Sequence, residues 1–174
     1  MKSRLPLPEI DEFWPAQRQV YESIKRTRGN IDGPFLAWLH SPELASHAEK
    51  LGAFCRYGTS LSLQESELLI LCVGAHHQCL GEQQIHEPIA RKAGLTDEMI
   101  GAVRRGDEPE FADERLSSLH TLATQLLATN RIEQDLFDRA RQVFGDKTLV
   151  EAVGILGYYA FVAMTLNAFE MGLE

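Results

Sequence analysis

Apolar residues recur along this chain at intervals of three and four, the spacing that places them on one face of a helix. The series Leu44, Ala48, Leu51 and Cys55 is the clearest case, and it ends near Gly58. No segment alternates apolar and polar residues between turn residues, as a strand would. The pattern therefore predicts an all-α protein. Comparable patterns and end signals predict further helices at about 15–28, 65–76, 79–94, 97–106, 116–130, 136–145 and 149–169.

Two of these segments, 65–76 and 149–169, are apolar on nearly every side, which predicts helices buried in a core. Each follows a Ser/Thr-x-x-Glu pattern typical of a capping box, Ser62 with Glu65 and Thr148 with Glu151. The uncharged part of the second segment is shorter than the roughly 20 residues that a membrane span needs. We therefore expect no membrane partner. The apolar surface of two such helices is more than a chain of this size can bury alone, so we expect a homo-oligomer.

Composition and charge narrow the class of protein. The chain has 174 residues, enough for one domain with a core, and 44% hydrophobic and 24% charged residues are typical of a soluble protein. A net charge of −8 without a basic run argues against a nucleic-acid partner. Three cysteines are too few for a disulfide framework, and the N-terminal residues lack the apolar core of a signal peptide. We therefore expect a reduced, cytoplasmic protein.

The stretch CLGEQQIHEPIARKAG, residues 79–94, holds the first candidate chemistry. Glu82 and His86 are four residues apart and share a helical face, where a carboxylate can fix the imidazole tautomer and strengthen the ring as a base. Cys79 is expected on the same face. Pro88 predicts a kink beside His86, because proline breaks a helical hydrogen bond. The alternative is an ordinary surface pair of little energetic value.

Two polar features interrupt the apolar helices. Glu67 lies one turn inside the segment 65–76, so it is either hydrogen-bonded or protonated in the core, or it shares a solvent-facing stripe with Gln64. Both alternatives remain open from the sequence. Tyr158 and Tyr159 on the last helix are interpreted as packing residues with satisfied hydroxyls.

Metal and thiol chemistry are the competing interpretations. Cys72, His76 and Cys79 have helical spacing and are ligands that zinc accepts, but glycines interrupt the segment and the short paired spacings of zinc sites are missing. Cys79 lacks a second cysteine three residues later, so it has no local partner for a disulfide. We expect neither a metal site nor an internal disulfide.

Four motifs in order resemble one family along nearly the whole chain. They are GPFLAWLHSPELA, ESELLIL, EQQIHEPIARKAGL and GILGYYAFVAMTLNAFEMGL, and together they resemble the carboxymuconolactone decarboxylase family within the alkylhydroperoxidase-D-like superfamily. The resemblance implies a single all-α domain over 1–174, with core motifs at about 35–106, an N-terminal helix at 13–28 and C-terminal helices at 112–172. It also implies a trimer or hexamer, sites near subunit contacts and no cofactor.

The same resemblance implies roles for individual residues. Glu67 matches the buried glutamate of the superfamily's site, Cys79 the first cysteine of its redox branch, and His86 the histidine of both branches. Glu82 stands where the redox branch has its second cysteine and the decarboxylase branch a glutamate. The chain departs from the decarboxylase pattern at residues 83 and 85, where a glutamine and an isoleucine replace an aromatic residue and a histidine.

The expected function is that of a cofactor-free acid/base enzyme resembling carboxymuconolactone decarboxylase, acting on a small carboxylated metabolite of lactone or keto-acid type. His86 would deliver or relay a proton, Glu82 would orient the imidazole and Glu67 would hold the polar network. Arg56 or Arg91 would bind the substrate carboxylate. The alternatives are a thiol peroxidase or disulfide reductase that uses Cys79, and a non-catalytic oligomeric binding protein.

Overall fold

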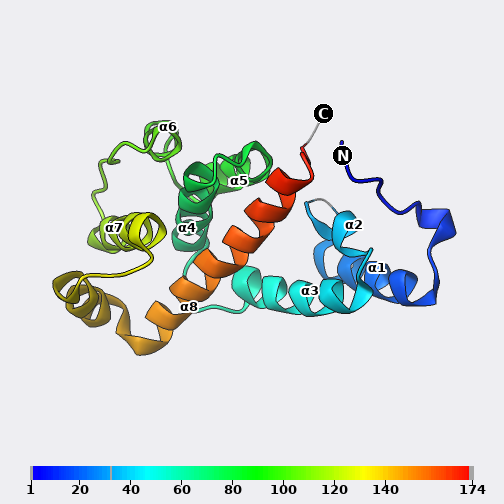
Figure 1. The fold of residues 1–174 in the computed structure, drawn as a ribbon. Helices are drawn as coiled ribbons and strands as arrows, with labels where there is room; N and C mark the ends of the chain where they lie inside the picture. Colours follow the sequence, from blue (N-terminus) through cyan, green and yellow to red (C-terminus); the bar gives the residue numbers. More distant parts are fainter. Residues whose placement is uncertain (1, 32, 173–174) are drawn as a thin grey trace.

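Helices joined by short loops make up the chain, as a computed structural model of residues 2–31 and 33–172 shows (Figure 1). Within this part of the chain the only β pairing is a single bridge between Lys2 and Gly172, so the predicted all-α class is confirmed. The helices are α1 (Pro15–Arg28), α2 (Phe35–Trp38), α3 (Pro42–Tyr57), α4 (Leu63–His76), α5 (Leu80–Lys92), α6 (Asp97–Arg105), α7 (Glu114–Thr129) and α8 (Gln134–Ala168).

Local signals determine most helix ends as predicted. At the start of α4 the Glu65 carboxylate accepts the backbone N–H of Ser62 at 2.7 Å, and the Ser62 hydroxyl accepts the backbone N–H of Glu65 at 3.2 Å. This reciprocal pair confirms the first capping box. Gly29 and Asn130 follow α1 and α7 in the left-handed conformation, with φ of 78° and 58°, which is how helices often end.

The second predicted capping box is wrong. The long helix α8 bends at Gly145, whose φ of 74° and ψ of 166° are not helical, and it resumes directly afterwards. Glu151 does not turn back onto Thr148; its carboxylate accepts the backbone N–H of Ser60 at 2.7 Å and the Ser60 hydroxyl at 2.5 Å. A partner distant in sequence therefore captures the carboxylate that the local pattern assigned to a cap.

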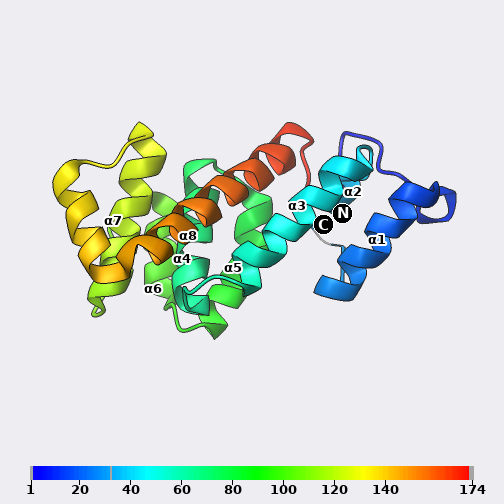
Figure 2. The same cartoon turned by 90° about the horizontal axis from the view of Figure 1, so that it is seen from below.

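Helix α4 lies at the centre of the packing and contacts α5, α6, α7 and α8. Its side chains Leu68, Leu69 and Val73 are fully buried, as its apolar sequence predicted. Helix α3 contacts α1, α2 and α8, so α8 connects the two groups of helices. Figures 1 and 2 show an elongated molecule with α7 at one end and α1 and α2 at the other, and α8 running diagonally between them. The middle of the molecule is thus where α3, α4, α5 and α8 converge.

Helix α8 is long and apolar enough to cross a membrane by length and composition. However, 61% of its most apolar window is buried inside the protein. That burial is what the core helix of a globular fold requires, which agrees with the interpretation made from the sequence. The cellular compartment stays a prediction.

Candidate active site

Glu67 and His86 form a buried pair between α4 and α5. The Nδ1 atom of His86 lies 2.7 Å from Oε2 of Glu67, and the two side chains are 4% and 1% exposed. Of the two alternatives for Glu67, the inward one is therefore correct. A carboxylate can only accept, so we place a proton on Nδ1, which leaves Nε2 for chemistry. The Tyr159 ring packs edge-on against the imidazole, with centroids 5.2 Å apart, and further restricts it.

Glu82 lies on the other side of the imidazole. Its Oε2 is 3.5 Å from Nε2 of His86, so the predicted pair is adjacent but lacks the short bond that Glu67 makes. The Glu82 side chain is buried, and among the described residues its Oε2 has no hydrogen-bond partner. Burial raises the pKa of the Glu82 carboxyl, and the Glu67 charge adds to this, while His86 and Arg56 oppose it. The raised pKa means that the Glu82 carboxyl holds its proton more readily than a carboxyl in water does.

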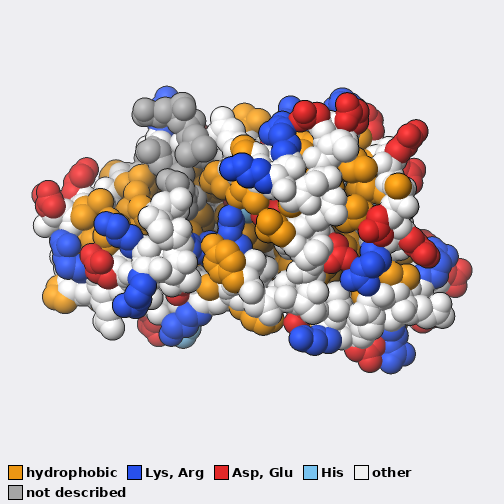
Figure 3. Space-filling view, turned by 180° about the vertical axis from the view of Figure 1, so that it is seen from behind, with side chains coloured by type: hydrophobic (Ala, Val, Ile, Leu, Met, Phe, Trp, Pro, Cys, Tyr) orange, Lys and Arg blue, Asp and Glu red, His pale blue; other side chains and the backbone are white. Residues whose placement is uncertain are grey.

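Glu82 and His86 line a cavity of about 360 Å³, which is within the range of small-molecule sites. Glu67 does not line it and instead supports His86 from behind. Apolar side chains complete part of the wall, and on the face seen from behind, basic and hydrophobic side chains lie beside one another near the middle (Figure 3). The apolar lining residues are Pro34, Phe35, Ile85, Ile89 and Val162.

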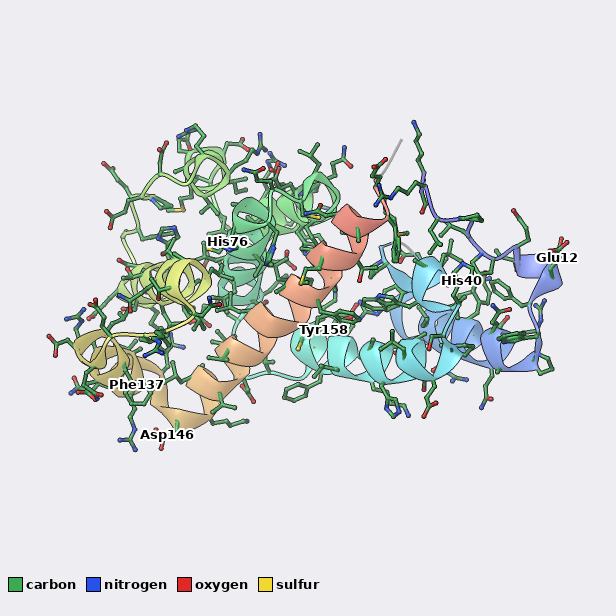
Figure 4. The ribbon with its side chains drawn as sticks, in the orientation of Figure 1. Glu12, His40, His76, Phe137, Asp146 and Tyr158 are labelled. Atoms are coloured by element: carbon green, nitrogen blue, oxygen red, sulfur yellow. The ribbon has the colours of Figure 1, made fainter. Side chains whose placement is uncertain are left out.

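Two arginines and three tyrosines line the same cavity. Burial alone would lower the pKa of Arg56, but Tyr159, Tyr57 and Glu67 hold that pKa above its usual value, so Arg56 stays charged. Burial raises the pKa of Tyr158 and of Tyr159, so both phenols keep their protons and can donate. The sequence predicts that both tyrosines pack in the core, and it does not show that they also line the cavity. Figure 4 shows Tyr158 where α8 passes α3.

The candidate thiol does not reach this cavity. Cys79 precedes the first residue of α5 as its N-cap and is fully buried, so it does not share the helical face of Glu82 and His86 as expected. Burial raises the pKa of Cys79, and it raises the pKa of Cys55 to about 11 and of Cys72 to about 12. All three cysteines are free. These surroundings favour unreactive thiols over thiolates.

Two other candidates lie outside the cavity. Arg91 is half-exposed and binds Asp97 at 2.6 Å and Glu87 at 3.4 Å, so Arg56 is the better placed of the two arginines proposed for the substrate.

Between residues 2 and 172, leaving out 32, no three His, Cys, Asp or Glu side chains gather as they would around a metal ion. His76, part of the alternative zinc set, lies apart from Tyr158 at the end of α4 (Figure 4). Helix α5 continues through Pro88.

Comparison with known proteins supports the family. The carboxymuconolactone decarboxylase family model matches residues 42–125. This region is a carboxymuconolactone decarboxylase family domain. The matched part of the family domain contains Arg56, Glu67, Glu82 and His86, whereas Tyr159 lies beyond it. No curated protein matches the chain.

Solved structures show that the likeness of fold extends over the whole chain. The alkylhydroperoxidase AhpD core of an uncharacterized peroxidase-related protein from Ralstonia eutropha JMP134 is 19% identical, with a TM-score of 0.81 over 99% of this chain and 92% of that one. A peroxidase-related protein from Silicibacter sp. TM1040 is 16% identical, with a TM-score of 0.82 over 97% and 90%. The debrominase Bmp8 in complex with 2,3,4-tribromopyrrole is 12% identical, with a TM-score of 0.78 over 100% and 93%. The chain therefore has the alkylhydroperoxidase-D-like fold.

Proposed function

We propose that this protein is a cofactor-free acid/base enzyme that decarboxylates a small carboxylated metabolite of the lactone or keto-acid type. One observation carries the proposal: the buried series Glu67–His86–Glu82 ends at a cavity that also holds the Arg56 cation. A base, an acid with a raised pKa and an anion-binding group on one small cavity are the requirements of this chemistry.

The cation and the phenol act on the breaking bond. Arg56 attracts the anionic substrate, whose carbon–carbon bond to the carboxylate then breaks and releases carbon dioxide. The electron pair of that bond passes into an enolate, whose oxygen accepts hydrogen bonds from Arg56 and the Tyr159 hydroxyl. Donors that meet charge as it develops lower the barrier, because they bind the transition state more strongly than the substrate.

The acid and the base complete the turnover. Protonated Glu82 gives its proton to the enolate carbon, and Nε2 of His86, 3.5 Å from Glu82, returns a proton taken from solvent. Glu67 fixes the imidazole and stabilises it while it is charged, through the 2.7 Å contact at Nδ1. The orienting role that the sequence led us to expect for Glu82 thus passes to Glu67, and Glu82 becomes the donor.

The thiol alternative has less support. A peroxidase needs a thiolate that peroxide can reach, yet Cys79 is buried, outside the cavity and has a raised pKa. The alternative of a passive binding protein gives no reason for a carboxyl whose Oε2 is buried without a hydrogen-bond partner.

The test is carbon dioxide release from a panel of β-keto acids and carboxylated lactones. His86→Gln should reduce turnover by about 10²–10⁴-fold, with folding checked by circular dichroism. Cys79→Ser should retain turnover. Wild-type turnover in His86→Gln, or loss of activity in folded Cys79→Ser, would contradict the proposal, and the second result would favour the thiol enzyme.

A further inference from the structure

A second cavity, of about 290 Å³, lies between α4, α6 and α7. Among the described residues, none lines both this cavity and the one that Glu82 and His86 line. Figure 1 shows α6 and α7 on the opposite side of α4 from α3. Helix α4 therefore serves two sites: its Glu67 supports His86, and Cys72, five residues later, lines the second cavity.

The interior of this second cavity is buried and largely apolar. Cys72 of α4, Val103 of α6 and His120 of α7 are 4%, 4% and 7% exposed, so they form its floor. Ala75 and Leu127 are partly buried and extend the apolar wall. An apolar cavity of roughly 150 Å³ is enough to bind benzene. The second cavity thus has room for a substituted ring.

His120 is the buried polar group of this cavity. Its ring is tilted against Phe111, with centroids 5.7 Å apart, and no described residue forms a hydrogen bond with its ring nitrogens. Unlike Oε2 of Glu82, these nitrogens are not sealed off by protein atoms, so they open onto the cavity. Polar groups buried to this extent usually have a partner. A ligand with one hydrogen-bonding group would supply it.

The state of the imidazole indicates which group the ligand brings. Burial lowers the pKa of His120, and the charge of Glu108 only opposes this effect. The ring is therefore neutral at pH 7, with one nitrogen that accepts a hydrogen bond. A hydroxyl donor fits such an acceptor.

The cations at the mouth of the cavity do not call for an anionic ligand. Arg104 already binds Glu87, with one contact at 2.8 Å, and Arg105 binds Asp107 at 2.7 Å. Both arginines are exposed, and each is neutralised by its carboxylate. A carboxylate ligand would lose its hydration without gaining an unpaired cation there.

We propose that the cavity between α4, α6 and α7 binds a small neutral phenol, whose ring lies against Cys72 and Val103 and whose hydroxyl donates to the His120 imidazole. A phenol keeps its proton at neutral pH, and its hydroxyl is a ready donor. Its rigid ring also buries apolar surface while few rotatable bonds are immobilised. This inference concerns binding alone and does not depend on the proposed decarboxylation.

The test is a titration followed by NMR of protein labelled with ¹³C at the methyl groups of Ile, Leu and Val. Val103 and Leu127 report on the second cavity, whereas Ile85, Ile89 and Val162 report on the first. The ligands are p-cresol, toluene and p-toluate, which share a methyl-substituted ring and carry a hydroxyl, no polar group and a carboxylate. Their Kd values come from the shifts of the second-cavity signals.

p-Cresol should shift the second-cavity signals to saturation. Toluene and p-toluate should bind there more weakly, because toluene would cover the imidazole without pairing it and p-toluate would bury a charge. His120→Leu should reduce the preference for p-cresol over toluene roughly 2- to 10-fold, the contribution of one hydrogen bond.

A second variant tests the location without altering the floor. Thr124 is an exposed residue of α7 that lines the cavity, so Thr124→Phe should fill the space and abolish binding of p-cresol. Thr121→Phe is the matched control. Thr121 is also exposed on α7 and also donates to a carbonyl of its own helix, but it does not line the cavity, so its replacement should leave binding unchanged.

Tighter binding of toluene or p-toluate than of p-cresol at the second-cavity signals would overturn the proposal. An undiminished preference in His120→Leu, or wild-type binding by Thr124→Phe, would do the same. Shifts confined to the first-cavity signals would place the phenol beside His86 instead and would also refute it. None of these results bears on carbon dioxide release, which its own assay decides.

Discussion

Replacing Glu82 with glutamine separates the stability of this site from its activity. The glutamine has nearly the same shape as the glutamate but cannot ionise or donate a carboxyl proton. In the wild type a buried carboxyl has one oxygen, Oε2, without a hydrogen-bond partner among the described residues. Keeping such an unpaired group charged in the folded protein costs about 1–3 kcal/mol, a cost that a neutral glutamine does not carry. We therefore expect Glu82→Gln to be more stable than wild type at neutral pH and far less active.

The pH dependence of stability provides a second check on the sign of the change expected for Glu82→Gln. Because the pKa of Glu82 is raised in the folded protein, the folded state keeps a proton that the unfolded chain releases. The stabilising contribution of that proton is complete below the ordinary value of 4.5 and is lost as pH rises through the raised pKa. A glutamine at position 82 does not ionise, so the variant does not lose stability in this way as pH rises. The gain in Tm of Glu82→Gln should therefore be near zero at acidic pH and grow toward neutral pH.

Thermal unfolding between acidic and neutral pH measures this gain. For a chain of this size, 1–3 kcal/mol corresponds to a rise in Tm from a few degrees to about 10 °C. Turnover should fall by about 10²–10⁴-fold, the usual contribution of a general acid.

Glu87→Gln is the matched control, since the same change is made on the same helix. Glu87 is also buried, but it binds Arg104, with one contact at 2.8 Å, and Arg91 at 3.4 Å. Its replacement should lower Tm and leave turnover largely intact. If Glu82→Gln is destabilised as Glu87→Gln is, or keeps wild-type turnover, then Glu82 is a paired structural carboxylate and our account of the site is wrong.

Three further predictions concern the cation, a distant ion pair and assembly. Arg56→Gln should raise KM and lower kcat for an anionic substrate in steady-state assays, whereas Arg91→Gln should change neither more than about twofold, because Arg56 lines the cavity and Arg91 does not. The Ser60 hydroxyl and N–H lower the pKa of Glu151. Glu151→Gln should therefore reduce stability above the ordinary glutamate pKa of 4.5, and the reduction should shrink as pH falls below that value. A difference in Tm between variant and wild type that stays constant with pH would contradict this. We still predict a homo-oligomer, trimer or hexamer, so light scattering should show smaller species for Val150→Glu, a change at an exposed apolar residue, and a monomeric wild type would refute this.

Helix limits could be predicted wherever the signal was local. The Ser62–Glu65 pair and the residues Gly29 and Asn130 determine their helix ends through neighbours a few positions away, so the sequence contains the whole interaction. The pattern Thr148–Glu151 is equally good by the same rule but fails, because Ser60 offers the carboxylate two donors from a different segment.

The site shows the same division. Spacing placed Glu82 and His86 together, and the structure brings Glu67 to the same imidazole. Spacing could not show that α5 begins only at Leu80, which leaves Cys79 outside the cavity. The contributions of α1 and α8 were missed because they depend on where these helices cross α3, and no local pattern encodes a crossing.

The wall of the cavity has two origins along the chain. The groups assigned to proton transfer, Glu82 and His86, lie inside the segment 42–125, whereas Arg28, Phe35 and Tyr158 come from α1, α2 and α8 outside it. Mutations in those outer helices can therefore alter which molecule fits while the reacting groups stay unchanged. During evolution, a protein with this layout could acquire new ligands through mutations in its outer helices alone. Exchanging α1 and α2 between homologues would test this directly.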